Sequence, residues 1–167
     1  MNSIKTIIKI LLSITLLLPV SCTIKGYDTL KLSTDFKTEG FLDPDHFQIV
    51  VKAYPDKGKR GLINKRESAL ENAEEQLNNT VIEKLSEYYL TFHFNKMGIR
   101  DKTSIITQTE KMAELKKVMS RYLNHGYRAF EYYNEDNSAV LVHRIFKNGL
   151  RTEIESIQIS FKPDTQN

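Results

Sequence analysis

A long run of helical periodicity constrains this chain more than any other feature of its sequence. Between residues 64 and 92, apolar side chains recur at steps of three or four, which places them on one face of an α-helix. This apolar stripe consists of Ala69, Ala73, Leu77, Val81, Leu85, Tyr88 and Phe92. Asn64 suits the capping position, and Glu67 follows three residues later. The sequence predicts a helix beginning near Asn64, whose small alanines allow its start to approach a sheet closely.

Shorter patterns on both sides of this helix predict a sheet. Residues 47–51 are a β-branched run that ends at a turn containing proline and glycine, and they predict a strand. Residues 127–133 and 139–146 predict two more strands, joined as a hairpin by the polar residues 134–138.

A second, shorter helix is predicted before the hairpin. Thr107 and Glu110 mark its start, and apolar residues keep helical spacing from Met112 to Tyr122. We expect Gly126 to end it in the left-handed conformation.

The C-terminal residues fit two patterns, because residues 150–161 match helical spacing and residues 157–161 match the alternation of a strand. We expect a short helical turn in residues 150–155 followed by a strand. The fold class predicted from all these elements is α+β, with an antiparallel-rich sheet and one long and one shorter helix packed on one face.

The N-terminal residues have the three-part layout of a secretory signal. Lys5 and Lys9 precede the apolar residues 10–18, and Ser21 and Cys22 follow shortly after. This run of about nine residues is too short for a membrane-spanning helix, which needs roughly 20. We therefore expect a signal peptide that is removed.

Cys22 is the only cysteine, so it cannot form an internal disulfide. Its position suits lipid transfer to its sulfur and cleavage after Ser21. Two or three acyl chains, at about 0.8 kcal/mol per buried methylene, anchor a protein stably. The alternative is an ordinary secretory signal with an unrelated cysteine nearby. Ser21 and Cys22 resemble the lipobox of bacterial lipoproteins, and Pro19 in the usual leucine position makes it similar to the relaxed, spirochaete-type lipobox.

Cleavage would leave 146 residues, the size of one domain. We predict a signal peptide (1–21), a lipidated cysteine and tether (22–45), a single α+β domain (46–162) and a disordered tail (163–167). The formal charge falls from +3 to +1, with 22 basic and 21 acidic residues. This balance does not favour nucleic-acid binding, and we expect none.

Several features of the mature chain resemble the Lpp-twenty family of small bacterial outer-membrane lipoproteins. They are the strand in residues 47–53, a glycine-containing loop, the helix with Ala69 and Ala73, and the late strand in residues 139–145. The resemblance covers about two-thirds of the mature chain. It implies an accessory or structural role at a membrane surface, in some members near the flagellar base, and no enzyme activity.

The best candidate binding site is a group of basic residues before the long helix. Its members are Lys57, Lys59, Arg60, Lys65 and Arg66. Backbone amides at a helix start attract anions, and cations strengthen that attraction, so these residues form a candidate anion-binding site. The phosphate-binding pattern GxxxxGK[ST] is absent. The alternative is a solvated turn whose charge balances the acidic face of the helix.

Other candidate chemistry is weaker. The histidines (His46, His93, His125 and His143) are far apart and lack HExxH spacing, although Asp43, Asp45 and His46 are neighbouring donors. No GxSxG nucleophile motif is present. An aromatic group could bind a partner or fill the core, and it comprises Tyr127, Phe130, Tyr132, Tyr133, Tyr88, Tyr89, Phe92 and Phe94. We expect no catalytic residue, no metal and no cofactor.

These features together predict a non-enzymatic lipoprotein of the bacterial cell envelope, with the outer membrane favoured. Lipid on Cys22 would hold it to the membrane, and an envelope protein would be its partner. The alternative is a ligand-binding lipoprotein that captures an anionic small molecule or envelope polymer at the basic turn. A closed cavity beside Lys59 and Arg60 would favour the alternative, whereas a filled core and exposed aromatic residues would favour the interaction role.

Overall fold

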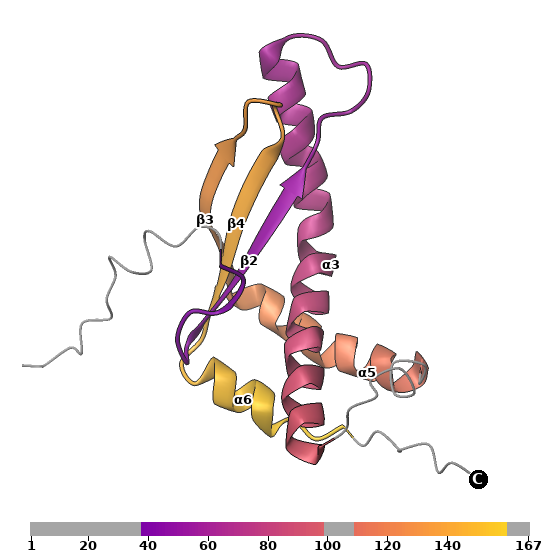
Figure 1. The fold of residues 1–167 in the computed structure, drawn as a ribbon, viewed down its shortest axis with the longest axis vertical. Coiled ribbons are helices and arrows are strands. Elements are labelled where there is room, and N and C mark those ends of the chain that lie inside the picture. Colours follow the sequence, from indigo (N-terminus) through magenta and orange to yellow (C-terminus); the bar gives the residue numbers. More distant parts are fainter. Residues whose placement is uncertain (1–37, 99–108, 160–167) are drawn as a thin grey trace, which may run out of the picture. The chain divides into compact units, whose positions relative to one another are not determined.

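A computed structural model of the chain describes residues 38–98 and 109–159, which form an α+β fold around an antiparallel sheet (Figure 1). The order of the four strands in this sheet is β1-β2-β4-β3. Their bounds are β1 Gly40–Phe41, β2 His46–Ala53, β3 Gly126–Tyr133 and β4 Ala139–Phe146. The predicted fold class and the predicted hairpin of β3 and β4 are confirmed.

The helices cover one face of the sheet and one of its ends. They are α3 Leu62–Met97, α5 Thr109–Met119, the 3-10 helix η1 Ser120–His125 and α6 Leu150–Ser156. α3 packs on β2 and β4, and α5 packs on α3. α5 and α6 lie toward the C-terminal half of α3 (Figure 1).

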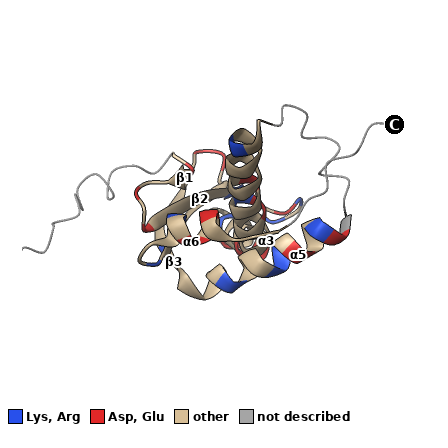
Figure 2. Ribbon diagram, turned by 90° about the horizontal axis from the view of Figure 1, so that it is seen from below, with Lys and Arg blue, Asp and Glu red and all other residues tan. Residues whose placement is uncertain are grey.

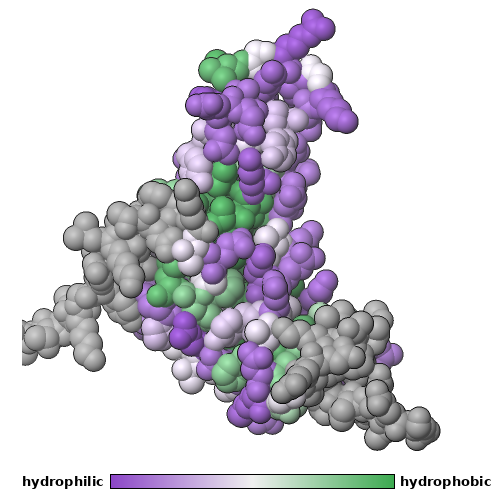
Figure 3. Space-filling view, in the orientation of Figure 1, coloured by the Kyte–Doolittle hydropathy of each residue, from purple (hydrophilic) through white to green (hydrophobic). Residues whose placement is uncertain are grey.

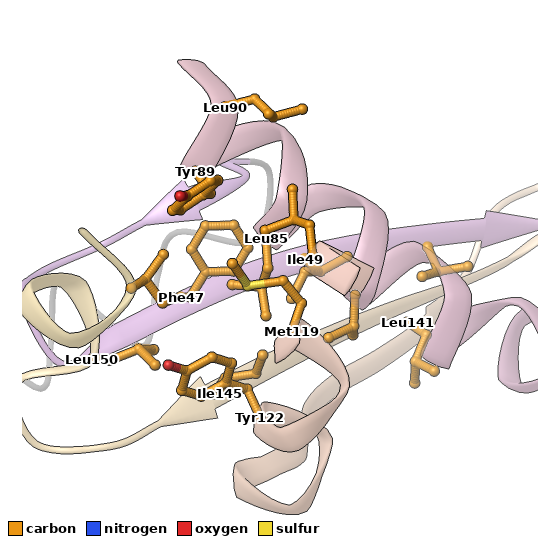
Figure 4. Packing of buried hydrophobic residues seen from close by; sticks show 14 of the residues in the cluster. Phe47, Ile49, Leu85, Tyr89, Leu90, Met119, Tyr122, Leu141, Ile145 and Leu150 are labelled. Atoms are coloured by element: carbon orange, nitrogen blue, oxygen red, sulfur yellow. The ribbon is translucent and has the colours of Figure 1, made fainter. Parts of the chain in front are cut away.

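The core lies between α3 and the sheet. Alternation along β2 turns Phe47, Ile49 and Val51 toward α3, and the antiparallel register places Leu141 and Ile145 of β4 beside them. Figure 4 shows Phe47, Ile49 and Ile145 in this core together with Leu85 of α3, Met119 of α5 and Leu150, the first residue of α6.

The start of α3 differs from the prediction. The helix begins at Leu62, with Gly61 at the N-cap and no side-chain cap. Asn64 lies inside the helix, where its side chain donates to the Arg60 carbonyl at 3.1 Å, so the predicted cap at Asn64 is wrong. Gly61 has φ +83°, which a glycine adopts without strain, and the helix can therefore begin two residues earlier.

The predicted apolar stripe of α3 is correct in its first half and rotates in its second. Ala69, Ala73, Val81 and Leu85 are buried, whereas Leu77, Tyr88 and Phe92 are only half-buried. Beyond Leu85 the buried apolar residues are Tyr89, Leu90 and Phe94. The buried face shifts because α5 and α6 pack against this half of the helix in addition to the sheet.

The second helix also ends differently. It tightens into η1, and Gly126 is extended, with φ −88° and ψ 147°, so the left-handed glycine predicted there is wrong. A Cβ at Gly126 would lie 2.1 Å from Nε2 of His143, and this close approach explains the glycine. The start predicted at Thr107 lies outside the described residues.

The boundaries of the fold differ from the predicted ones at both ends. The prediction places residues 38–45 in the tether, but β1 pairs with β2 and Asp45 is buried, so these residues belong to the fold. The helix predicted at 150–155 is confirmed as α6, whereas residues 157–159 form no strand. Phe161, Cys22, the predicted signal peptide and the predicted tail lie outside the described residues. No helix in the described ranges is both long and apolar enough to cross a membrane.

Candidate functional site

The turn between β2 and α3 is fixed to the helix by hydrogen bonds around Asp56. The Asp56 amide donates to Ser68 Oγ, and the Asn72 side chain donates to Asp56 Oδ1, both at 3.0 Å. The Asn72 side chain also donates to the Tyr54 carbonyl at 3.0 Å. Hydrogen bonds from Asn72 and Ser68 lower the pKa of Asp56. The turn is therefore held in place although its side chains face solvent.

The structure divides the five predicted cations into two sets. Lys57, Lys59 and Arg60 are exposed on the turn, and Lys65 is half-buried in the first turn of α3. Arg66 points elsewhere, with its guanidinium 5.1 Å from the ring centre of Tyr133 on β3. We call residues 57–65 the basic tip, and this segment contains four cations and no carboxylate.

Two apolar residues missed by the sequence analysis lie within the basic tip. Leu62 and Ile63 are 56% and 70% exposed, at the end of the molecule where α3 begins. Figure 3 shows a small hydrophobic patch among hydrophilic side chains at that end. Helical spacing could have identified only Ile63 as exposed, because Leu62 lies seven residues before Ala69 and therefore on the same face of the helix as the stripe.

Charge is distributed differently on the second helix. α5 carries both signs, with Glu110 and Glu114 among Lys111, Lys116 and Lys117, and Figure 2 shows this mixture. Lys111 and Glu114 form an ion pair at 2.9 Å. The single-sign charge of the basic tip therefore contrasts with the balanced surface of α5.

The sheet face opposite α3, which we call the second face, carries aromatic side chains. Tyr127, Tyr132 and Phe146 are exposed there, whereas Val140, Val142 and Arg144 of β4 on the same face are buried. At the centre of this face Arg144 donates to Gln48 Oε1 at 2.7 Å. In the rest of the predicted aromatic group, Tyr89 and Phe94 are buried, and the half-buried members are Tyr88, Phe92, Phe130 and Tyr133.

The neighbouring donors Asp43, Asp45 and His46 do not converge on one point. Both oxygens of Asp43 lie 2.9–3.0 Å from Nδ1 of His46. The Asp45 carboxylate instead accepts from the Gly149 amide at 2.6 Å, immediately before α6. These contacts close the turn before β2 and fix it to α6, which is a structural role. The part of the chain that the structure describes contains no group of three or more His, Cys, Asp or Glu that could hold a metal ion.

The other histidines lie apart from this turn and from one another. His93 packs against Tyr89, with ring centres 4.2 Å apart, and burial followed by the nearby Lys96 lowers its pKa. Burial and then Arg128 lower the pKa of His143. Both imidazoles are therefore held toward the neutral form inside the fold.

Two tyrosines bind carboxylates of α6. Tyr88 donates to Glu155, and Tyr122 donates to Glu153 at 3.2 Å. Burial, together with the carboxylate partner, raises the pKa of each phenol to about 12. These phenols remain protonated and serve as hydrogen-bond donors that fasten α6 to the rest of the fold.

A hollow of about 330 Å³ opens between α3 and α5. Leu90, Phe94 and Met112 form its apolar floor, and Glu83, Glu87 and Lys116 stand around it. Neither Lys59 nor Arg60 lines it. The basic tip therefore presents its cations on an open surface away from this hollow.

Comparisons of the chain with models of known protein families, with curated proteins and with solved structures found no match. The resemblance to the Lpp-twenty family stays a prediction from the sequence.

Proposed function

We propose that this chain is a membrane-anchored lipoprotein of the bacterial envelope with a non-enzymatic structural or protein-interaction role. The observation that carries the proposal is the only cysteine, Cys22, which directly follows Ser21 and lies just behind the apolar residues 10–18. Acyl chains on that sulfur and on the new amine would hold the protein at a membrane, with the outer membrane favoured.

The second face of the sheet supports the interaction role. Tyr127, Tyr132 and Phe146 are exposed on it, and aromatic side chains are enriched in protein interfaces. The core between α3 and the sheet is filled by side chains, which is typical of a scaffold that acts through its surface. An envelope protein that contacts these three exposed aromatic side chains is the partner we propose.

A second candidate function is anion binding at the basic tip. The three exposed cations favour it, because they lie beside helix amides that have no side-chain cap. An open turn suits an extended anion, such as an envelope polymer, better than an enclosed small molecule.

Fatty-acid labelling in growing cells tests the anchor. We expect labelled palmitate to enter the wild-type protein and Thr23→Ala, and we expect Cys22→Ala to carry no label and to move to the soluble fraction. Thr23→Ala is the matched control because it changes the adjacent residue and leaves the sulfur in place. Membrane retention of Cys22→Ala without label would contradict the proposal.

Photo-crosslinking in intact cells tests the partner. A photoreactive residue in place of Tyr132 should yield one dominant crosslinked product. The same residue in place of Glu71, which is exposed on α3, should yield none. Equal crosslinking from both positions would count against recognition through the second face.

A further inference from the structure

The basic tip combines two properties that are rarely found together on a surface exposed only to water. Leu62 and Ile63 are consecutive and more than half exposed, and they occupy the first two positions of α3. A single exposed apolar side chain is ordinary, but this pair lies between Lys59 and Arg60 on one side and Lys65 on the other. An apolar centre bordered by cations matches the interface of a bilayer, where acyl chains lie beneath phosphates.

The charge of the chain is concentrated at this same place. The basic tip has four cations and no carboxylate, so it contributes +4. The remainder of the chain from Cys22 onward is net −3, because the total for those residues is +1. An anionic surface would therefore attract the molecule through this end and repel most of the rest.

The backbone at the tip reinforces this polarity. The first turn of α3 contains no acidic residue, and Gly61 at the N-cap provides no side-chain acceptor for its amides. The positive end of the helix dipole therefore adds to the lysine and arginine charges. An acidic cap, which is common at helix starts, would have opposed binding to phosphate.

The tip is also held firmly enough to act as a contact. Hydrogen bonds join Asp56 to Ser68 and to Asn72, and Lys59 N–H donates to the Asp56 carbonyl at 3.3 Å. Because the fold already orders this segment, the cations and the apolar pair lose little conformational entropy when the tip binds a surface.

The length of the chain before the fold allows the tip to reach the membrane that holds an anchor. Fifteen residues lie between Cys22 and Thr38, and the sixteen Cα–Cα steps between them span at most about 55 Å when the chain is extended. This reach is similar to the length of α3, whose 36 residues extend for about 54 Å.

We infer that the basic tip binds directly to an anionic phospholipid bilayer, with Leu62 and Ile63 entering the interface while Lys57, Lys59 and Arg60 contact lipid phosphates. This contact is separate from acylation of Cys22 and does not depend on it. A soluble phosphate or polymer would engage the cations alone, whereas a bilayer also takes up the apolar pair, and this difference allows a direct test.

The chain contains no tryptophan, so one introduced indole reports its own surroundings without background. The full chain carrying Ile63→Trp is reconstituted with phosphatidylcholine vesicles, with and without phosphatidylglycerol, and bound protein is isolated by flotation. With the anionic vesicles we expect a blue shift of the emission and quenching by brominated acyl chains. Met97→Trp is the matched control, because Met97 is 53% exposed at the other end of α3, and we expect it to show neither change.

A charge series identifies the residues responsible. In the Ile63→Trp chain, the triple variant Lys57→Gln, Lys59→Gln, Arg60→Gln should need about tenfold or more anionic lipid for half of the emission shift. The matched control is Lys116→Gln, Lys117→Gln, Arg121→Gln, which removes two lysines and one arginine from an exposed part of α5 and η1. We expect that control to need the same amount of anionic lipid for half of the emission shift as the Ile63→Trp chain without charge substitutions.

Three results would overturn the proposal. They are a water-exposed indole at position 63 in floated anionic vesicles, failure of the full chain to float with them, and equal effects of the two triple variants. Quenching that falls no further in sodium phosphate than in sodium chloride of the same ionic strength supports the bilayer as the ligand, whereas a larger loss in phosphate would assign the cations to a soluble anion. Repeating the series with Cys22→Ala separates the tip from the anchor, because tip insertion should persist when the acyl label is lost.

Discussion

The two halves of α3 are held to the molecule by different forces. In the first half, Ala69 and Ala73 are buried against the sheet, and polar contacts surround them, including an ion pair between Arg128 and Glu74. In the second half, large apolar side chains such as Leu85 and Phe94 are buried beneath α5 and α6. One continuous helix is thus attached through close backbone approach at one end and through burial of apolar area at the other.

This difference separates the part of α3 that stabilises the fold from the part that can meet a surface. Burial of a large apolar side chain contributes about 1.5–3 kcal/mol, whereas exposed polar contacts contribute roughly 0–1 kcal/mol. The second half should therefore carry most of the stability. The basic tip, at the far end of the first half, can then be substituted with little effect on folding.

Leu85→Ala is the strongest test of this comparison. Leu85 is fully buried in the core, so we expect its truncation to lower the free energy of unfolding by about 2–5 kcal/mol. Leu62→Ala removes the same atoms from the exposed end of the same helix and should change stability by no more than about 0.5 kcal/mol. Urea denaturation followed by circular dichroism measures both. Similar losses from the two variants would refute the distinction between the halves.

Ala73→Leu tests the close approach in the first half. Ala73 is fully buried, and a larger side chain would push α3 away from its neighbours, so we expect a loss of about 1–3 kcal/mol. Ala113→Leu is the matched control, because Ala113 is exposed on α5 and leucine has a similar helix propensity. If both variants unfold at the wild-type urea midpoint, the space beside Ala73 is larger than its burial indicates.

The sequence predicted those features of the fold that depend on local periodicity. The helical spacing from Ala69 to Leu85 and the strand pattern of residues 139–146 are each set by which side chains face the core, and both appear in the structure. The rotation of the buried face after Leu85 was not predictable in this way. It depends on α5 and α6, which are distant in sequence and cover that half of the helix.

The candidate site was predicted only in part. The cations of the basic tip were identified because charge can be read from composition, but the cap at Asn64 was misassigned. Gly61 supplies a backbone conformation that replaces the side-chain cap. The packing of Arg66 on Tyr133 joins residues on α3 and β3, and only the register of the sheet reveals such contacts.

Gly126→Ala examines one glycine whose role was misassigned from sequence. The added methyl group would meet the ring of His143, and we expect a loss of about 1–2 kcal/mol. His143→Ala in the same chain should relieve this clash, so the double variant should be less destabilised than the sum of the two single ones. A double-mutant cycle from thermal unfolding measures the coupling. Additive losses would show that backbone conformation, rather than the neighbouring ring, requires glycine at this position.

The smallest effect we predict is a loss of stability in mild acid that arises from His93 and His143. Burial lowers the pKa of both side chains in the folded protein below the ordinary value of 6.5, so the unfolded chain binds protons first as the pH falls. Their contribution is fully present above about pH 6.5 and is lost as the pH falls through the lowered folded pKa values. Both side chains are half-buried, and solvent screening keeps the effect small.

Urea midpoints measured between about pH 7.5 and pH 5 isolate this contribution, because carboxylates titrate mainly below that window. We expect His93→Gln with His143→Gln to flatten the pH dependence. His125→Gln, which replaces an exposed side chain, should leave the wild-type slope. His93 lies on the second half of α3. If His93→Gln alone reduces the slope of the urea midpoint against pH, part of the acid sensitivity arises in the half of α3 that carries the apolar core. If the double variant retains the full slope, His93 and His143 do not link protonation to folding.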